Sequence, residues 1–279
     1  MMTRLAFLLL AAPLIAAAAP SRAADGGKID LCDFKPAYAD DFHDLSISPR
    51  KLDGRRWIAH TPWNGDFGDA KFSDPAPDFP FTLKDGGLVI TARKDGLRWR
   101  SGLIAAADAS GAGWGVQYGY FEARMRMPPG PGTWPGFWLG SLKPTADPSP
   151  GVEIDVVEYY GHATNAYSSS LHVWYKGADK AKSTHLVHHT PVEPDSLTTG
   201  FHDYGVRVAP DAITYYFDRT EVWRQPTPPE LKTPLFPLVD LALGSGFPID
   251  KTPNPSELAV KYVHLYSYDP EGRASRCPK

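Results

Sequence analysis

Short runs in which apolar and polar side chains alternate recur along the chain. A period of two is typical of half-buried β-strands, because successive side chains leave opposite faces of an extended chain. No segment shows a convincing helical period of 3.6 residues, and 28 prolines interrupt the chain at short intervals. The pattern predicts strands at Gly87–Arg93, Tyr118–Met127, Trp134–Ser141, Val152–Tyr160, Tyr167–Tyr175, His202–Val208, Ile213–Asp218, Leu238–Leu243 and Val260–Tyr268. Many short strands separated by Gly and Pro turns favour an all-β fold, a jelly-roll sandwich of two antiparallel sheets.

The run 151–160, GVEIDVVEYY, places three acidic side chains among β-branched apolar ones. In a regular strand Glu153 and Asp155 share one face, whereas Glu158 has the opposite parity. One extra residue at positions 156–157, a β-bulge, would return Glu158 to the face of the other two acids. Like charges on one solvated strand face repel each other, which makes an exposed edge strand the poorer explanation. We therefore expect the three acids to line one cleft.

Carboxyl groups crowded into a cleft are typical of glycosidases, because burial and crowding raise the pKa of one carboxyl group and leave another ionised. The run 153–158, EIDVVE, resembles the ExDxxE signature of glycoside hydrolase family 16, in the bulged form of its laminarinase-like branch. The resemblance implies a retaining endo-β-glucanase that needs no cofactor. It assigns Glu153 as the nucleophile, Glu158 as the general acid and base, and Asp155 as the residue that holds Glu153 in place.

The predicted strand Tyr118–Met127 has one apolar and one polar face, as expected in a sandwich whose concave sheet forms a polysaccharide cleft. Its segment YGYFEAR resembles the YGxFEAR strand of the family. That resemblance implies that Glu122 and Arg124 bind sugar hydroxyls beyond the cleavage point. An ion pair between these two side chains is the alternative.

Large aromatic rings supply the next candidates. The segment 132–140, GTWPGFWLG, resembles the GTWPxFW segment of the family. On a strand Trp134 and Trp138 share a face with glycines between them, which suits a floor on which sugar rings stack; burial in the core is the alternative. His172 and Trp174 share a face of the following predicted strand. We expect that strand to pair with the acidic one and to bring His172 near the acids.

Two further segments contain possible site residues. The segment 61–70, TPWNGDFGDA, resembles a stretch of family members that cut bacterial exopolysaccharides, which makes Asn64 a candidate for sugar binding. A packed turn is the alternative for this segment. His185, His188 and His189 suggest a metal site, but their polar surroundings lack other ligands at an established spacing, so a solvated loop is favoured.

The run 260–266, VKYVHLY, resembles the last strand of the family, where many members have an Asp that contributes to a structural calcium site away from the cleft. Lys261 stands at that position here. An ammonium group can occupy the space of a cation but cannot ligate one, so Lys261 argues against calcium.

Residues 1–23 resemble a secretory signal, with Arg4 ahead of the apolar stretch Leu5–Ala19 and a cleavage site at Ser21-Arg22-Ala23; cleavage within 16–19 is an alternative. We expect a single mature domain, 24–279, that is secreted or periplasmic. The chain has only two cysteines, Cys32 and Cys277. In an oxidising compartment they are expected to form a disulfide, with two free thiols as the alternative.

Composition limits the possible partners. The chain has 279 residues, enough for one large β domain, and its net charge of −3 offers no electrostatic basis for nucleic-acid binding. No later segment is long and apolar enough to span a membrane. Aromatic residues make up 12% of the chain, with eight Trp, which suits a polysaccharide substrate. We expect a monomer that hydrolyses β-1,3, β-1,4 or mixed-linkage glucan or a bacterial exopolysaccharide. A transglycosylase with the same carboxylates and a non-catalytic carbohydrate-binding sandwich remain alternatives.

Overall fold

The computed structural model describes residues 27–63 and 65–277, so the expected signal sequence, residues 1–23, and Asn64 lie outside the described residues. The strands are β1 (Phe34–Asp40), β2 (Ile47–Ser48), β3 (Trp57–Ile58), β4 (Ala70–Phe72), β5 (Phe81–Leu83), β6 (Leu88–Asp95), β7 (Arg98–Ser101), β8 (Leu103–Ala105), β9 (Gly119–Arg126), β10 (Thr133–Ser141), β11 (Gly151–Glu158), β12 (Ala166–Trp174), β13 (Thr184–Pro191), β14 (His202–Val208), β15 (Ala212–Phe217), β16 (Thr220–Pro226), β17 (Leu235–Leu243) and β18 (Ser256–Tyr268). The short helices are η1 (Leu31–Asp33), η2 (Gly177–Lys182), α1 (Ser196–Thr199) and α2 (Arg273–Arg276). Every strand that the alternating pattern predicts is present, with ends that shift by a few residues.

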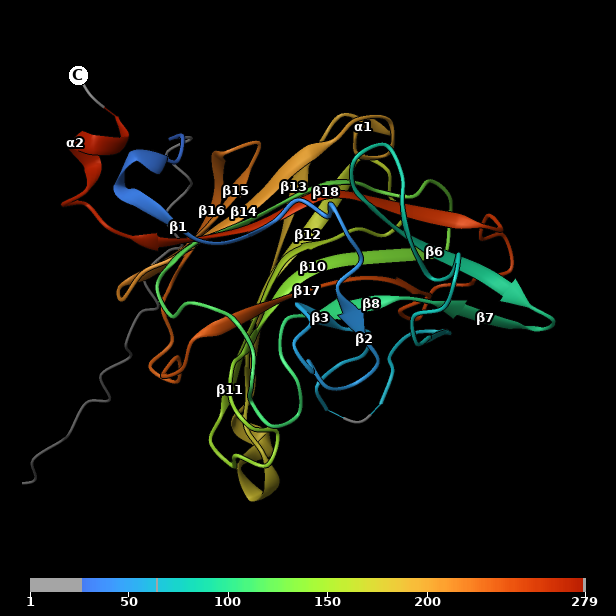
Figure 1. The fold of residues 1–279 in the computed structure, drawn as a ribbon, viewed down its shortest axis with the longest axis horizontal. Coiled ribbons are helices and arrows are strands. Elements are labelled where there is room, and N and C mark those ends of the chain that lie inside the picture. Colours follow the sequence, from blue (N-terminus) through green and yellow to red (C-terminus); the bar gives the residue numbers. More distant parts are fainter. Residues whose placement is uncertain (1–26, 64, 278–279) are drawn as a thin grey trace, which may run out of the picture.

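The strands form two sheets, which confirms the predicted jelly-roll sandwich (Figure 1). The first sheet has the order β16-β15-β14-β9-β18-β6-β7-β4, with β1 paired to β18 and β5 to β6; the second has the order β13-β12-β11-β10-β17-β8-β3-β2. Most neighbours run antiparallel, and the exceptions are β2 with β3 and β4 with β7. We call these the first and the second sheet below.

The core lies between the sheets and consists of the apolar members of the alternating runs. Phe121 and Met125 of β9 are fully buried on one side of it, and Phe137, Leu139 and Ile154 of the second sheet are fully buried on the other. Because neighbouring side chains of a strand point in opposite directions, burying these residues turns the polar members of β10 and β11 to the outer face of the second sheet. That face carries the three acids.

Strand β11 contains the predicted β-bulge. On β12, Asp155 lies opposite Ser170 and Glu158 opposite Ser168, so three steps along β11 match two along its partner. On β10 the register likewise skips Val156. The extra residue restores the parity of Glu158, so that its side chain leaves the same face as Glu153.

The structure corrects the placement of Glu122 and Arg124. Both lie on β9, which belongs to the first sheet, whereas the three acids lie on the second. Neither do the two residues pair with each other: Arg124 contacts Asp203 at 3.0 Å, and Glu122 contacts Arg219. The alternation along β9 predicts one packed and one polar face, as the structure has them, but it does not reveal which sheet the strand joins.

Glu122 is fully buried and holds a polar network on the outer face of the first sheet. Its two oxygens accept hydrogen bonds from the Arg219 guanidinium at 2.8 and 2.9 Å. Tyr120 donates to it at 2.8 Å and Tyr262 at 3.0 Å. A buried carboxylate with a cationic partner and four donors is a structural element, since burial without such partners would be costly.

The prediction for segment 184–191 is wrong as well. The segment forms β13, the edge strand of the second sheet, rather than a solvated loop. Its polar, histidine-rich sequence shows no strand pattern, yet the segment pairs with β12 along its whole length. An edge strand tolerates such a sequence because one of its sides faces solvent.

Lys261 lies at the position where the family resemblance raised the question of calcium. Its ammonium group donates to the backbone carbonyl of Asp85 and lies 5.0 Å from the ring centre of Phe201. The Arg126 guanidinium lies over the same ring, also at 5.0 Å. Two positive side chains at one place do not fit a divalent cation, which requires oxygen ligands.

Cys32 and Cys277 form the predicted disulfide, with their Cα atoms 5.7 Å apart. It links η1, just before the first long strand, to the residue that directly follows α2, beyond the last strand (Figure 1). No helix among residues 27–63 and 65–277 is long and apolar enough to cross a membrane.

We predict that Glu122→Gln destabilises the fold without lowering turnover. Loss of the charge weakens hydrogen bonds to a charged group, worth about 1.5–3 kcal/mol in the free energy of unfolding. Urea unfolding measures this cost. Glu257→Gln is the matched control: this exposed residue of β18 lies 3.5 Å from Lys84, and such a surface pair contributes about 1 kcal/mol or less. A stable Glu122→Gln protein with weakened sugar binding would restore the sugar-binding role.

Candidate active site

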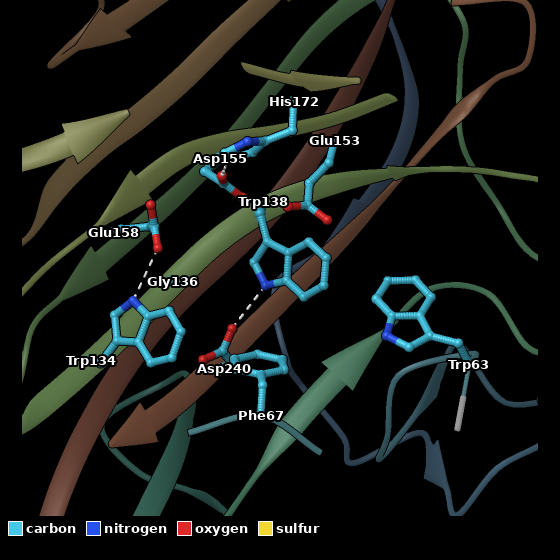
Figure 2. A pocket seen from close by; sticks show the side chains of 10 residues that line it. All are labelled: Trp63, Phe67, Trp134, Gly136, Trp138, Glu153, Asp155, Glu158, His172 and Asp240. Carbon is cyan, nitrogen blue, oxygen red and sulfur yellow. Dashed lines mark hydrogen bonds and ion pairs between the residues drawn. The ribbon is translucent and has the colours of Figure 1, made fainter. Parts of the chain in front are cut away.

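A cleft of about 270 Å³ lies on the outer face of the second sheet. Strands β10, β11, β12 and β17 form its floor, and the segment that precedes β4 contributes one wall. Figure 2 shows the side chains that line it: Trp63, Phe67, Trp134, Gly136, Trp138, Glu153, Asp155, Glu158, His172 and Asp240. Six of these ten were expected from the sequence as site residues: Trp134, Trp138, Glu153, Asp155, Glu158 and His172.

The bulged strand brings Glu153, Asp155 and Glu158 into this cleft (Figure 2). Asp155 Oδ2 lies 2.9 Å from His172 Nε2. One carboxyl oxygen of Glu153, one of Asp155 and one ring nitrogen of His172 all lie within 4.8 Å of one another. Glu153 and His172 are direct cross-strand neighbours in the β11–β12 register. The pairing of two adjacent strands therefore places the histidine against the acids.

Glu158 is oriented by three hydrogen-bond donors. Trp134 Nε1 donates to Oε1 at 3.0 Å, and the Tyr160 hydroxyl lies 3.3 Å from the same oxygen. The Ser170 hydroxyl donates to Oε2 at 3.3 Å. These donors come from three strands or their ends, so the carboxyl group is held from several sides while it faces the cleft.

The two tryptophans of β10 differ in their surroundings. Trp134 is half-buried, but Trp138 is only 7% exposed, and its Nε1 donates to Asp240 at 2.8 Å. The ring centre of Trp138 lies 5.8 Å from that of Trp63 and 6.0 Å from that of Phe67. Trp138 thus combines the two alternatives considered for it, because it lines the cleft and is packed like a core residue.

Trp63 is the exposed ring of this cluster, at 40% exposure. It also borders a second hollow that continues the cleft beyond Glu153, together with Trp174 and Phe236. Trp174 is 40% exposed as well. Sugar rings stack on exposed aromatic faces, so this end of the groove suits part of a polysaccharide.

A third hollow continues the cleft at the opposite end, beyond Glu158. Aromatic side chains line it, among them Tyr160, His162 and Phe247. Tyr160 stacks parallel to Trp134 with ring centres 6.2 Å apart, and His162 lies 3.9 Å from Phe247. The carboxyl groups therefore stand in the middle of a groove that extends past them in both directions.

The acids of the cleft lack a fully charged partner, since the described residues that line it include no Lys or Arg. Burial, and then the charge of Asp155, raise the pKa of Glu153 to about 8. Burial likewise raises the pKa of Asp155 well above its usual range, and the charges of Glu158 and Asp240 add to this. At neutral pH the cluster therefore retains at least one proton.

His172 links this cluster to the edge strand. Its Nδ1 lies 2.7 Å from Nδ1 of the exposed His185 on β13, so one ring donates and the other accepts. Glu153, Asp155 and His172 are close enough to hold a metal ion in principle. The ligand atoms of Asp155 and His172 are already paired with each other, however, which accounts for their separation without a metal.

Sequence reasoning missed Asp240, a cleft carboxyl group that is 2% exposed. The signal was present: Asp240 is the single charged residue in the run 235–243, LFPLVDLAL, which forms β17. A lone charge in an apolar strand is costly to bury unless it has partners or a function. Trp63 and Phe67 lie in segment 61–70, which resembles a stretch that forms part of the cleft in family members, but Asn64 was the candidate named from it and these two rings were not.

Comparison with known proteins shows the family of the chain. The family model for glycosyl hydrolases family 16 matches residues 84–246. The chain is 33% identical over 201 residues to the endo-1,3-1,4-beta-glycanase EglC of Rhizobium meliloti, covering 68% of this chain and 40% of that protein. It is 28% identical over 207 residues to a beta-glucanase of Rhodothermus marinus, covering 66% of this chain and 68% of that protein. The chain thus spans less than half the length of EglC.

Solved structures show the same fold. The laminarinase catalytic domain of Thermotoga maritima superimposes with a TM-score of 0.63 at 20% identity, covering 84% of this chain and 98% of that one. A non-specific endo-beta-1,3(4)-glucanase, SCLam, superimposes with a TM-score of 0.69 at 20% identity, covering 89% of this chain and 96% of that one. The family model covers more than half of the chain and includes the bulged strand with its three acids. The chain belongs to the glycosyl hydrolases of family 16.

Proposed function

We propose that this protein is an endo-acting β-glucanase that hydrolyses β-1,3, β-1,4 or mixed-linkage glucan, or a bacterial exopolysaccharide, by double displacement. The observation that carries the proposal is the position of the three acids, in the middle of a groove that continues past Glu153 at one end and Glu158 at the other. A polymer can lie across such a groove and be cut internally. The names of the relatives, a beta-glycanase and a beta-glucanase, support the same substrate class.

In the first step Glu153 attacks the anomeric carbon and forms a glycosyl-enzyme ester, while Glu158 gives its proton to the departing glycosidic oxygen. In the second step Glu158 takes a proton from water, and that water breaks the ester and releases Glu153. The donors from Trp134, Tyr160 and Ser170 keep Glu158 aimed into the cleft throughout. A retaining mechanism requires the two glutamate carboxyl groups to lie about 5–5.5 Å apart.

Asp155 holds the proton that the cluster retains at neutral pH. It is the most deeply placed acid of the three, and the raised pKa of its carboxyl group follows first from that burial. A protonated Asp155 removes one of the negative charges that raise the pKa of Glu153, and so favours the ionised form that a nucleophile must take, while burial still keeps part of Glu153 protonated near neutral pH. Its contact with His172 at 2.9 Å fixes its orientation.

Transglycosylation is a second candidate, favoured by the aromatic hollow beyond Glu158. A sugar bound on Tyr160, His162 and Phe247 would compete with water for the glycosyl-enzyme ester. Product analysis on a β-glucan, with and without an added oligosaccharide acceptor, separates the two activities. Lengthened products indicate transfer, new reducing ends alone indicate hydrolysis, and no change in either assay indicates a carbohydrate-binding protein.

We further propose that the protein is exported, secreted or periplasmic, and acts as a monomer. The disulfide between Cys32 and Cys277 supports an oxidising compartment, because such bonds are rare in the cytosol.

Glu153→Gln and Glu158→Gln are each expected to lower kcat on a β-glucan by about 10²–10⁴-fold or more, since each removes a group that takes part in bond cleavage. Asp155→Asn is expected to have a smaller effect. A reducing-end assay measures these changes. Azide should restore activity to Glu153→Ala with an inverted glycosyl azide as product, whereas wild-type turnover in Glu153→Gln would exclude Glu153 as the nucleophile.

Glu153→Gln is also expected to stabilise the protein increasingly as the pH rises. Glutamate titrates near 4.3 in an unfolded chain, whereas the pKa of Glu153 in the folded protein is about 8. The folded protein binds more protons between these values, so the stability of the wild type falls with rising pH across that window. The difference in Tm between variant and wild type should therefore grow from pH 4.5 to pH 8. A constant difference would contradict this.

Trp63→Ala is expected to raise KM by about tenfold with a small change in stability, because loss of stacking worth about 1.4 kcal/mol changes an equilibrium tenfold. Trp138→Ala should instead destabilise the fold by about 3–5 kcal/mol, as truncation of a buried aromatic does. Thermal unfolding and initial rates on one glucan separate the two effects. Equal Tm values for both variants would show that Trp138 is not packed as the structure indicates.

A further inference from the structure

Asp240 is a buried carboxyl group of the cleft for which the mechanism above has no use. The β-sheet register places it in one row with the general acid: Gly136 of β10 pairs with Glu158 of β11 on one side and with Asp240 of β17 on the other. Gly136 has no side chain, so nothing in this row stands between the two carboxyl groups (Figure 2). A Cβ atom at Gly136 would lie 3.4 Å from Asp240 Oδ1.

Each carboxyl group of this row accepts a hydrogen bond from a tryptophan of β10. Trp134 donates to Glu158 at 3.0 Å, and Trp138 donates to Asp240 at 2.8 Å (Figure 2). The backbone N–H of Ala242 donates to the other oxygen of Asp240 at 3.0 Å. Both oxygens of Asp240 thus face donors, which is the arrangement that an ionised carboxylate needs.

The charge of Asp240 is opposed by its burial and by other acids. Burial raises the pKa of Asp240 to about 7, the hydrogen bonds from Trp138 and Ala242 lower it, and the charge of Glu158 raises it. On β8 the cross-strand neighbour of Asp240 is the apolar Leu103. The titratable groups that line the cleft with it are Glu153, Asp155, Glu158 and His172.

We propose that Asp240 is a positioning residue for the general acid: its negative charge across Gly136 keeps the proton on Glu158 until the glycosidic oxygen takes it, and its hydrogen bond fixes the Trp138 ring. This deepens the proposed function and rests on the role assigned there to Glu158. When Glu158 carries its proton, it has no negative charge to repel that of Asp240, so Asp240 ionises more readily. After the proton has left, the two like charges make Glu158 a better base for the attacking water.

Asp240→Asn tests this role, because it keeps the shape and the acceptor for Trp138 but removes the charge. Charges two strands apart, about 10 Å, interact enough at an effective dielectric of 20 to change a titration midpoint by about one unit. The alkaline limb of the kcat/KM profile should therefore move about one pH unit downward, with rates at pH 5 within about twofold of the wild type. An unmoved limb in a folded variant would overturn the proposal.

Asp40→Asn is the matched control. Asp40 is also buried, at 4% exposure, and its carboxyl group likewise accepts from a tryptophan Nε1, that of Trp57 at 2.7 Å, and from a backbone N–H, that of Phe42 at 2.9 Å, but it lines neither the cleft nor the two hollows that continue it. Its loss should leave the pH profile in place. A shift equal to that of Asp240→Asn would mean that the profile reports a general change in the fold.

A titration without turnover covers the case in which Asp240→Asn does not fold. The protein is labelled with ¹³C at the aspartate carboxyl groups. The Asp155→Asn substitution removes the signal of the other cleft aspartate whose pKa is raised, so the signal that still titrates near neutral pH belongs to Asp240. Adding Glu158→Gln should lower its midpoint, because coupling between two groups is reciprocal. An unchanged midpoint would overturn the proposal. A separate result would contradict the proposed function itself: the single variant Glu158→Gln would hydrolyse the glucan as fast as the wild type.

Discussion

The whole site depends on one extra residue in β11. Val156 and Val157 are both buried, and the bulge lets two consecutive residues point away from the cleft face before Glu158 returns to it. In a regular strand Glu158 would point into an apolar core, where an isolated carboxylate is very costly. Both neighbours of β11 accommodate the extra residue, since β10 and β12 each have one residue fewer than β11 at this point. The hydrogen bonds of three strands therefore hold the distance between nucleophile and acid.

The strands, the bulge and the clustering of the acids could be predicted because they depend on local pattern. Alternation reports which side chains share a face, and the parity of Glu158 required an insertion. The alternating pattern does not report which sheet a strand joins. For that reason Glu122 was expected in the cleft, although it lies on β9 in the first sheet. Asp240 and Trp63 reach the cleft only through tertiary packing. Asn64 lies outside the described residues and stays a prediction.

Glu122 and Glu153 show how the environment divides one residue type between two roles. Glu122 has Arg219 and two tyrosine hydroxyls as partners and is fully buried. Glu153 is half-buried beside other acids, in a cleft whose described lining contains no Lys or Arg, and the pKa of its carboxyl group rises accordingly. The first arrangement satisfies a charge and stabilises the sandwich. The second leaves a charge poorly satisfied, which lowers stability and raises reactivity.

The disulfide closes the chain between Cys32 and Cys277 into a covalent loop. Cys32 precedes β1 and Cys277 follows β18, and these two strands are themselves paired from Phe34 to Asp40. Strand β18 is also the partner of β6 and β9, so it lies inside the first sheet rather than at its edge. Peeling β1 from the sheet would thus require pulling against β18, so the bridge restrains the fraying of both strands. An exoprotease that trims ends would meet a bridged pair of strands before it reached any residue of the cleft.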